Sequence, residues 1–338
     1  MTPETPNALQ AFTSLANVTE TDLHQITPIL SVHAYKIISI INAFFLTLCV
    51  GAMGIFTNTA NISVYLKMGL SEATNIYFFA LSISDLLVSL SAVVVKITSN
   101  PPVSAMKLPS GAPVSELGMA VTYIMFPCMG CSAWITAILS VERCLCISTP
   151  LKVKEIFTPK RTMFLILIMV IYQMVFIFLL FLNPGPPYDV VNKKKSLYFM
   201  SSSSVPSFIC FFVVFVSTLL LVVKLKQNVE WRSNAAKQSN TSSGSAREMK
   251  AAKCVVAICT IFIICFTPTI VLVVTGLIYP KFTHQDPYLG TLMRSLYALS
   301  ILMQVLSSSI NIFVYYAMGS KYRDVFNALF CRRKDIRG

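Results

Sequence analysis

Charge is scarce in this sequence, and acidic residues are the scarcest. Charged residues make up 12% of the 338 positions and only 14 residues are Asp or Glu, whereas an average soluble domain is about 25% charged. Apolar residues reach 55% and the mean hydropathy is +0.69. A soluble core could not bury so much apolar surface, so the chain is expected to lie mainly in lipid. Disordered, collagen-like and disulfide-rich secreted proteins are excluded.

Histidine is also scarce, and the cysteines are not arranged as metal ligands. His24, His33 and His284 fall outside the long apolar runs, and the ten Cys lack the spacing of zinc ligands. Neither a metal cluster nor a nucleophile with a neighbouring base can be assembled from these residues. The sequence therefore predicts no metal, no resident cofactor and no enzymatic activity.

Long runs without charge are abundant instead. Six such runs reach the roughly 20 residues that a spanning helix needs, and a seventh is interrupted only by Asp85 and Lys96. Backbone polar groups in lipid must be paired within each segment, and these runs are too long for barrel strands. We predict an all-α membrane protein, a seven-transmembrane helix bundle with a short amphipathic helix after the last span. The spans are expected at about 37–66, 73–98, 117–147, 162–183, 197–225, 251–279 and 289–318.

The distribution of Lys and Arg predicts the orientation. The expected parts are an N-terminal tail (1–36), the bundle (37–318) and a C-terminal helix and tail (319–338). With the N-terminus outside, 19 of the 27 Lys and Arg lie on the inner side, which is the side favoured by the positive-inside rule. We expect a multi-pass plasma-membrane protein with an extracellular N-terminus and a cytosolic C-terminus. The net charge of +13 then attracts anionic membrane lipids and is not read as a nucleic-acid-binding surface.

The N-terminal tail carries two further expectations. Residues 1–6 lack the basic and apolar regions of a cleavable signal peptide, so the first span is expected to direct insertion itself. Asn17 begins an Asn-Val-Thr sequence on the expected outer side. We predict glycosylation at Asn17.

Asp85 is the most informative single residue. A carboxylate in the middle of a span is costly unless it faces a wet cavity or a partner, so it indicates a functional site. The alternative is a stray charge at a contact between helices. Other spans supply small polar side chains that could hold waters or a cation near the carboxylate: Asn58, Ser132, Ser307, Ser308 and Asn311.

Five motifs in order carry a family resemblance. They are Asn58 in the first span, Leu81-Ser82-Ile83-Ser84-Asp85 in the second, Glu142-Arg143-Cys144 closing the third, Cys265-Phe266-Thr267-Pro268 in the sixth and Asn311-Ile312-Phe313-Val314-Tyr315 in the seventh. Over residues 40–331 the chain resembles the rhodopsin-like (class A) G-protein-coupled receptors. Its cytosolic loops look most like those of invertebrate orphan receptors of the FMRFamide-like and molluscan chemosensory kind.

The resemblance implies an activation switch and a heterotrimeric G-protein partner. It implies that Arg143 pairs with Glu248 across the third and sixth helices in the resting state; the alternative is a solvated surface pair of little energy. Pro268 should kink the sixth helix and let its cytosolic end swing outward, unless it is merely a tolerated kink. The switch residues that the resemblance implies are Glu142, Arg143, Glu248, Phe262, Phe266, Pro268, Asn311 and Tyr315.

The segment after the seventh span has an amphipathic pattern. Tyr322, Val325, Phe326 and Leu329 share one face of a helix over 321–330, which is expected to lie along the inner membrane surface. Cys331 follows it and is a candidate palmitoylation site; the alternative is an idle thiol.

Departures from the family pattern constrain the ligand. The usual extracellular disulfide lacks both partners, because its third-helix position is Gly118 and 183–200 contains no Cys. Met125 replaces the Asp of amine receptors and Val305 replaces the retinal-binding Lys of opsins. Neither a biogenic amine nor retinal is therefore expected.

The expected ligand is an extracellular neuropeptide or a chemosensory small molecule. The predicted cavity wall consists of Lys96, Tyr123, Met125, Phe126, Phe266, Tyr297 and Ile301. Lys96 is expected to receive an anionic or strongly polar group; alternatively it snorkels to lipid headgroups or pairs with Glu116. The competing function is a seven-helix ion or solute transporter that uses Asp85 as an ion site. If the chain is a receptor, Asp85 is a candidate site for an allosteric sodium ion.

Overall fold

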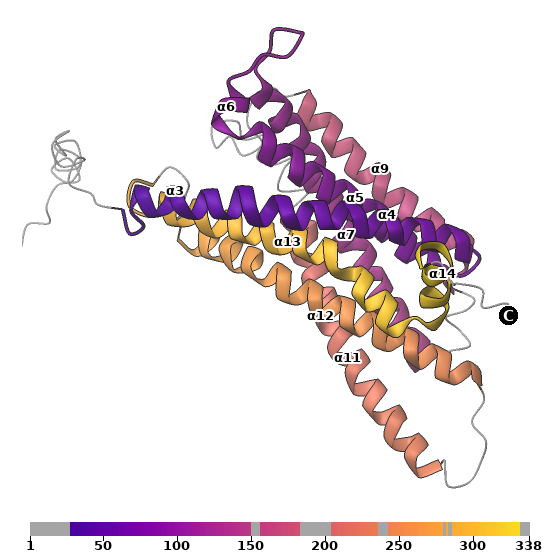
Figure 1. Ribbon diagram of the computed structural model, residues 1–338. Helices are drawn as coiled ribbons and strands as arrows, with labels where there is room; N and C mark the ends of the chain where they lie inside the picture. Colours follow the sequence, from indigo (N-terminus) through magenta and orange to yellow (C-terminus); the bar gives the residue numbers. More distant parts are fainter. Residues whose placement is uncertain are drawn as a thin grey trace, which may run out of the picture.

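A computed structural model of the chain describes residues 28–149, 156–182, 204–235, 243–279, 282 and 286–331. Figure 1 shows a bundle of long helices that run side by side. The described residues contain no strand, only one isolated bridge between Lys107 and Pro113. The all-α prediction is therefore confirmed.

The described helices follow one another along the chain in this order. The first membrane segment is continuous and consists of α3 (Val32–Ile40), a π-helical stretch η1 (Ile41–Thr47) and α4 (Leu48–Met68). The other long helices are α5 (Ala73–Thr98), α7 (Val114–Ser148), α9 (Pro159–Phe181), α11 (Val205–Ala235), α12 (Ser243–Ile278) and α13 (Gly290–Met318). Two short helices complete the described part, α6 (Pro101–Ser104) and α14 (Ser320–Phe330).

Length and hydropathy mark these helices as membrane spans. Six of them qualify among the described residues: Val32–Met68, Ala73–Thr98, Val114–Ser148, Val205–Gln227, Met249–Ile278 and Gly290–Met318. The 23-residue α9 is also strongly apolar along its length and packs on α5 and α7. These helices together form the predicted seven-helix bundle.

The bundle has apolar outer faces and a partly polar interior. Phe45, Phe56 and Phe164 are more than 60% exposed, whereas Asn58 and Asp85 are almost fully buried. This distribution suits a protein surrounded by lipid, where apolar side chains face outward and polar groups must find partners inside.

Packing places α7 at the centre, in contact with α5, α9, α11 and α12. On the opposite side of α5, α4 packs against α5 and α13. Gly54 permits a close approach there, because a Cβ at this position would overlap the hydroxyls of Ser89 and Ser309. The bundle has two ends, which we name the α6 end and the α14 end after the short helices that lie there (Figure 1).

Candidate functional site

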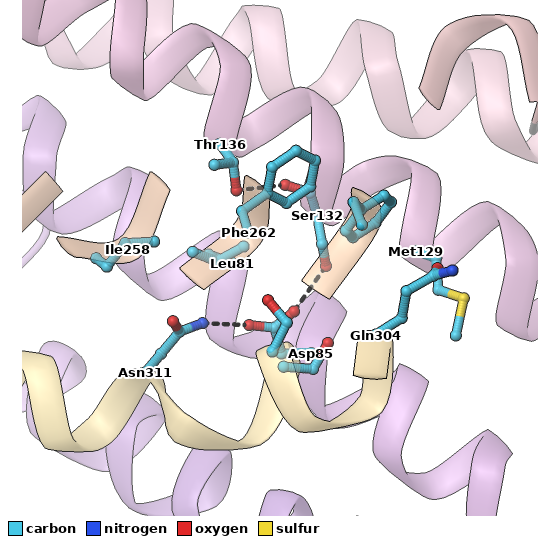
Figure 2. A pocket seen from close by; sticks show the side chains of 12 residues that line it. Leu81, Asp85, Met129, Ser132, Thr136, Ile258, Phe262, Gln304 and Asn311 are labelled. Atoms are coloured by element: carbon cyan, nitrogen blue, oxygen red, sulfur yellow. Dashed lines mark hydrogen bonds between the residues drawn. The ribbon is translucent and has the colours of Figure 1, made fainter. Parts of the chain in front are cut away.

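Asp85 lies in the middle of the bundle and joins three helices. The Ser132 hydroxyl on α7 donates to its Oδ1 at 2.8 Å, and the Asn311 amide on α13 donates to its Oδ2 at 2.9 Å. Figure 2 shows both side chains converging on the carboxylate. Only 2% of Asp85 is exposed. The three side chains therefore form one buried polar contact among α5, α7 and α13.

The local sequence of α5 explains how a carboxylate is accommodated there. Leu81, Ser82, Val88 and Ser89 share the buried face with Asp85, at the three- and four-residue spacing of one helical face. The hydroxyl of Ser89 donates to the backbone carbonyl of Asp85 at 2.8 Å, and Ser82 bonds its own helix in the same way. These serines consequently need no partner on another helix.

Asn58 ties α4 to α13 beside this contact. Its amide Nδ2 donates to the backbone carbonyls of Gly54 at 2.9 Å and Ser308 at 2.8 Å. Thr57 adds a hydroxyl bond to the carbonyl of Ser309 at 2.9 Å. Two adjacent carbonyls of α13 are thus held by side chains of α4.

A small cavity adjoins Asp85. The volume open to the centre of a water-sized sphere is about 20 Å³, and one water needs about 10–15 Å³ on this measure. The predicted polar residues Asp85, Ser132, Ser307, Ser308 and Asn311 all line it, together with Leu81, Met129, Thr136, Ile258, Phe262, Phe266 and Gln304. The cavity therefore has room for one water or one small ion beside the carboxylate.

Two predicted switch residues form an aromatic wall of this cavity. The rings of Phe262 and Phe266 stack with centroids 4.1 Å apart, one helical turn before Pro268, which lies inside α12. Gln304 was not predicted. Its Nε2 donates to the Thr269 hydroxyl at 2.6 Å and so links α12 to α13 directly beside Pro268.

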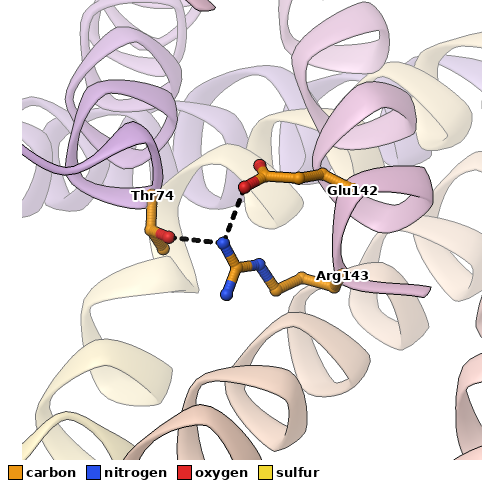
Figure 3. Close-up of polar contacts among 3 residues, drawn as sticks. All are labelled: Thr74, Glu142 and Arg143. Carbon is orange, nitrogen blue, oxygen red and sulfur yellow. Dashed lines mark hydrogen bonds and ion pairs between the residues drawn. The ribbon is translucent and has the colours of Figure 1, made fainter. Parts of the chain in front are cut away.

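Arg143 lies near the α14 end of α7 with two polar contacts. Its Nη2 donates to Oε1 of Glu142 at 2.8 Å and to the Thr74 hydroxyl on α5 at 2.6 Å (Figure 3). The Arg143 side chain is 11% exposed and that of Glu142 is 3% exposed, so solvent screens this ion pair weakly. Sequence reasoning missed Thr74, because a threonine at the start of a helix carries no signal of its distant partner. The predicted partner Glu248 lies in the second turn of α12, but its side chain is not among those described, and that pairing stays a prediction.

Aromatic rings from four helices gather between Arg143 and α14. Tyr315 packs on Phe78 and Tyr65 with ring centroids 4.8 Å and 5.4 Å apart, and Tyr322 of α14 lies 5.6 Å from Tyr315. The predicted switch residue Tyr315 is only 1% exposed. This cluster connects α4, α5, α13 and α14.

A large cleft opens at the α14 end. Its volume on the same measure is about 780 Å³, enough for a segment of another molecule. Arg143, Glu142 and Thr74 line it together with Tyr315 and Tyr322. Lys250 and Lys321 lie on its wall. The predicted switch residues around Arg143 and Tyr315 therefore border one accessible space.

The predicted ligand wall lies toward the α6 end. Met125 is buried in an apolar cluster with Val88 and Val305, against which Phe126 and Ile301 pack. Phe266 instead lines the small cavity beside Asp85. Tyr123 is 7% exposed, and Tyr297 lies on α13, where its carbonyl accepts the Ser300 hydroxyl. Lys96 is in the last turn of α5, and in the described part of the chain it makes no ion pair with Glu116.

The position of the missing disulfide is occupied in another way. Gly118 of α7 faces Thr98 so closely that a Cβ at Gly118 would overlap the threonine hydroxyl. That hydroxyl is fixed by bonds to the carbonyls of Val94 at 2.8 Å and Val95 at 3.2 Å. The ends of α5 and α7 nearest α6 are therefore joined by direct packing, and a cysteine at Gly118 would not fit without movement.

The two predicted modification sites lie at opposite ends of the chain. Cys331 is exposed and follows the last residue of α14. Asn17 lies outside the described residues.

Comparison with known proteins identifies the family. Residues 58–315 match the model of a family described as 7 transmembrane receptor (rhodopsin family). No curated protein sequence matches the chain. Receptors of this family are not enzymes and generally need no cofactor, which confirms two predictions. Because the match covers most of the chain, from Asn58 to Tyr315, the chain belongs to the rhodopsin family of seven-transmembrane receptors.

Proposed function

We propose that this receptor binds an extracellular ligand at the α6 end and activates a heterotrimeric G protein at the α14 end. The observation that carries the proposal is the 780 Å³ cleft bordered by Arg143 and Tyr315. It lies on the far side of the Asp85 contact from the predicted ligand wall. A signal must therefore pass through the polar core that joins α5, α7 and α13.

Orientation follows from charge. Within the described residues, the α14 end carries Lys250, Lys321 and Arg323 together with most of the other basic residues, and basic loops stay in the cytosol. The α14 end is accordingly the cytosolic end of a plasma-membrane receptor, and the N-terminus is extracellular.

The switch works through differential binding. A ligand shifts the conformational equilibrium of the receptor toward the state that it binds more tightly. The equilibrium constant changes by no more than the ratio of the ligand's affinities for the two states. Ligand contacts near Phe266 act on the Phe262–Phe266 stack beside Pro268, where α12 lacks a backbone hydrogen bond and bends most easily. Outward movement of α12 enlarges the cleft and exposes Arg143 to the G protein.

The resting state is held by contacts of Arg143. Glu142 and Thr74 bind its guanidinium in the described structure, and we include Glu248 of α12 as a third partner. A weakly exposed Arg–carboxylate contact biases a two-state element because breaking it leaves a charge without a partner. Release of Arg143 is therefore coupled to the movement of α12.

The ligand is a neuropeptide or a chemosensory small molecule with an anionic or strongly polar group. Lys96 at the outer end of α5 supplies the positive charge, and Met125, Phe126 and Ile301 supply apolar contact. Ligand sites typically combine mostly apolar walls with a few polar or charged groups that fix the orientation of the ligand. The absence of an ion pair to Glu116 among the described residues leaves the Lys96 ammonium available for this role.

Three accessory features complete the proposal. Asp85 and the hydroxyls around the 20 Å³ cavity provide hard oxygen ligands for a sodium ion that favours the resting state. Palmitate on Cys331 anchors α14 to the inner leaflet, where its basic residues meet anionic lipids. Asn17 carries a glycan on the extracellular tail.

A screen tests the ligand class, and a substitution tests the site. Cells that express the receptor are challenged with acidic and amidated neuropeptides and with water-borne odorants while G-protein activation is recorded. Lys96→Met is expected to lower the potency of an anionic agonist by about tenfold or more, because the loss of one charge-assisted hydrogen bond weakens binding by about that factor. Unchanged potency in Lys96→Met with an anionic agonist would exclude this role for Lys96.

A further inference from the structure

Asn61 occupies an unusual position for an amide side chain. It lies on α4 one turn after Asn58 and is fully buried. Its Nδ2 lies 3.4 Å from Oδ1 of Asn58, and its Oδ1 accepts a hydrogen bond from the hydroxyl of Tyr322 at 2.5 Å. A buried amide needs partners, and here one partner, Asn58, lies on the side of the polar core and the other, Tyr322, belongs to α14.

Tyr322 makes this contact from a different kind of element. It is the one residue of α14 that is buried among those described, and its ring packs against Tyr65 and Tyr315 with centroids 5.4 Å and 5.6 Å apart. Burial raises the pKa of the Tyr322 hydroxyl well above its ordinary value. The hydroxyl therefore stays protonated and remains a donor throughout the physiological pH range.

The contact continues into the centre of the bundle. Asn58, the other neighbour of Asn61, donates to the carbonyl of Ser308 on α13. Asn311, one turn further along α13, donates to Asp85. Side chains thus connect α14 through Asn61 and Asn58 to the backbone of α13, one turn from the residue that binds Asp85.

We propose that Asn61 and Tyr322 are positioning residues that couple the docking of α14 to the polar core. The Tyr322–Asn61 hydrogen bond holds α14 against α4 while Arg143 is bound to Glu142 and Thr74. Its loss frees α14 and raises ligand-independent activation. The effect on activation rests on the proposed G-protein coupling, whereas the effect on α14 docking does not.

Single substitutions have a defined chemical consequence. Tyr322→Phe keeps the ring packing and leaves the Oδ1 of Asn61 buried without a donor. Asn61→Val leaves the Tyr322 hydroxyl buried without an acceptor. The double variant places two apolar groups of similar shape together, and such a replacement costs much less than leaving one group buried without a partner. Both variants with Asn61→Val also lose the long 3.4 Å contact from Asn61 to Oδ1 of Asn58, which is the smaller effect.

The experiment is a double-mutant cycle on the purified full-length receptor in lipid nanodiscs. Amide hydrogen exchange over 320–330 reports the docking of α14, and basal nucleotide exchange by added G protein, per folded receptor, reports activation. Each single variant is expected to speed amide exchange in α14 roughly tenfold, the factor expected for one buried hydrogen bond. Basal nucleotide exchange should rise about threefold or more, and the double variant should lie close to the wild type in both measurements.

The chain offers a control on the same short helix. The Tyr316 hydroxyl of α13 donates to Oδ1 of Asn327 of α14 at 3.1 Å, but this bond is exposed. Tyr316→Phe is expected to change neither measurement.

Three results would overturn the proposal. They are strictly additive effects in the cycle, a Tyr316→Phe effect equal to that of Tyr322→Phe, and faster amide exchange without any change in basal activation. A further outcome is that the wild type activates no G protein while the effects of the two substitutions on amide exchange in α14 are non-additive. In that case the coupling of α14 to α4 is supported and the proposed function is wrong.

Discussion

Asp85 illustrates how one side chain acquires its role from its neighbours. Its carboxylate accepts from Ser132 and Asn311, and the adjacent cavity has room for one small ion. An ion that binds only the folded state stabilises it by RT ln(1 + c/Kd), where c is the ion concentration, so the stabilisation grows with the logarithm of the concentration once that exceeds the dissociation constant.

We predict that sodium raises the thermal stability of the wild type and not that of Asp85→Asn. Asparagine keeps the size of the side chain and removes its charge, so the attraction for a cation is lost. Melting temperatures in sodium chloride and choline chloride at equal ionic strength provide the measurement. Thr136→Val is the control, because Thr136 lines the same cavity but its hydroxyl already donates to the Ser132 carbonyl. A sodium effect that persists in Asp85→Asn would place the cation elsewhere.

Gly118 is a second residue whose role depends on a single neighbour. Adding a methyl group there forces it against the fixed Thr98 hydroxyl. We predict that Gly118→Ala lowers the free energy of unfolding by about 1–3 kcal/mol, as other overpacked sites do. Thermal unfolding measures this, with a shift of roughly 2–4 °C per kcal/mol.

The Gly118 prediction has an internal rescue and a control. Gly118→Ala with Thr98→Ala should recover most of the loss, because the hydroxyl that the methyl group would meet is gone. Gly276→Ala in α12 should not destabilise the receptor, because a Cβ there meets nothing within 4 Å. Equal losses in Gly118→Ala and Gly276→Ala would contradict the packing explanation.

Among the helices, α5, α7 and α12 all border the cleft at the α14 end, where we propose that the switch acts. Thr74 of α5 and Glu142 of α7 hold Arg143, and α12 borders the same cleft through Lys250 and Cys254. A helix that moves there must change these contacts, which gives the switch two alternative arrangements.

We predict that Thr74→Val raises basal nucleotide exchange about two- to fivefold, because Arg143 loses one polar contact and valine keeps the shape of threonine. Glu248→Ala should act in the same direction if α12 also binds Arg143. Thr59→Val is a suitable control, since its exposed hydroxyl donates only to the Ile55 carbonyl of its own helix. Unchanged basal exchange in Thr74→Val would show that the Thr74–Arg143 contact does not hold the resting state. Unchanged exchange in Glu248→Ala would show the same for the predicted pairing of Arg143 with Glu248.

For the molecule as a whole, receptor and transporter differ in what they do with the space inside the bundle. A transporter needs a path for its solute, with charged groups or broken helices along it. The cavity beside Asp85 is about 20 Å³, while the 780 Å³ cleft lies at the α14 end. This arrangement suits a signalling switch.

We predict that the purified receptor accelerates nucleotide exchange on a G protein in response to its ligand, and that Arg143→Gln abolishes the acceleration while ligand binding remains. The reason is that Arg143 borders the cleft at which we propose that the G protein binds. Melting temperatures confirm that the variant is folded. Solute flux through receptor-containing liposomes above that of empty liposomes would contradict the receptor function.

The sequence by itself determined the class of fold and the polar centre. Apolar runs of about 20 residues have one stable solution in lipid, and a lone Asp85 within such a run already indicates a buried polar partner. The order of motifs from Asn58 to Tyr315 also sufficed to indicate the family, which the match over residues 58–315 confirms.

Only the tertiary structure decided which distant side chains meet. Thr74 with Arg143, Thr98 with Gly118 and Tyr322 with Asn61 are pairs from different helices. The helical period shows which face of a helix is buried, but not its rotation and height relative to the neighbouring helices. Those quantities depend on how all the helices pack at once, and they set the partner of each buried polar group.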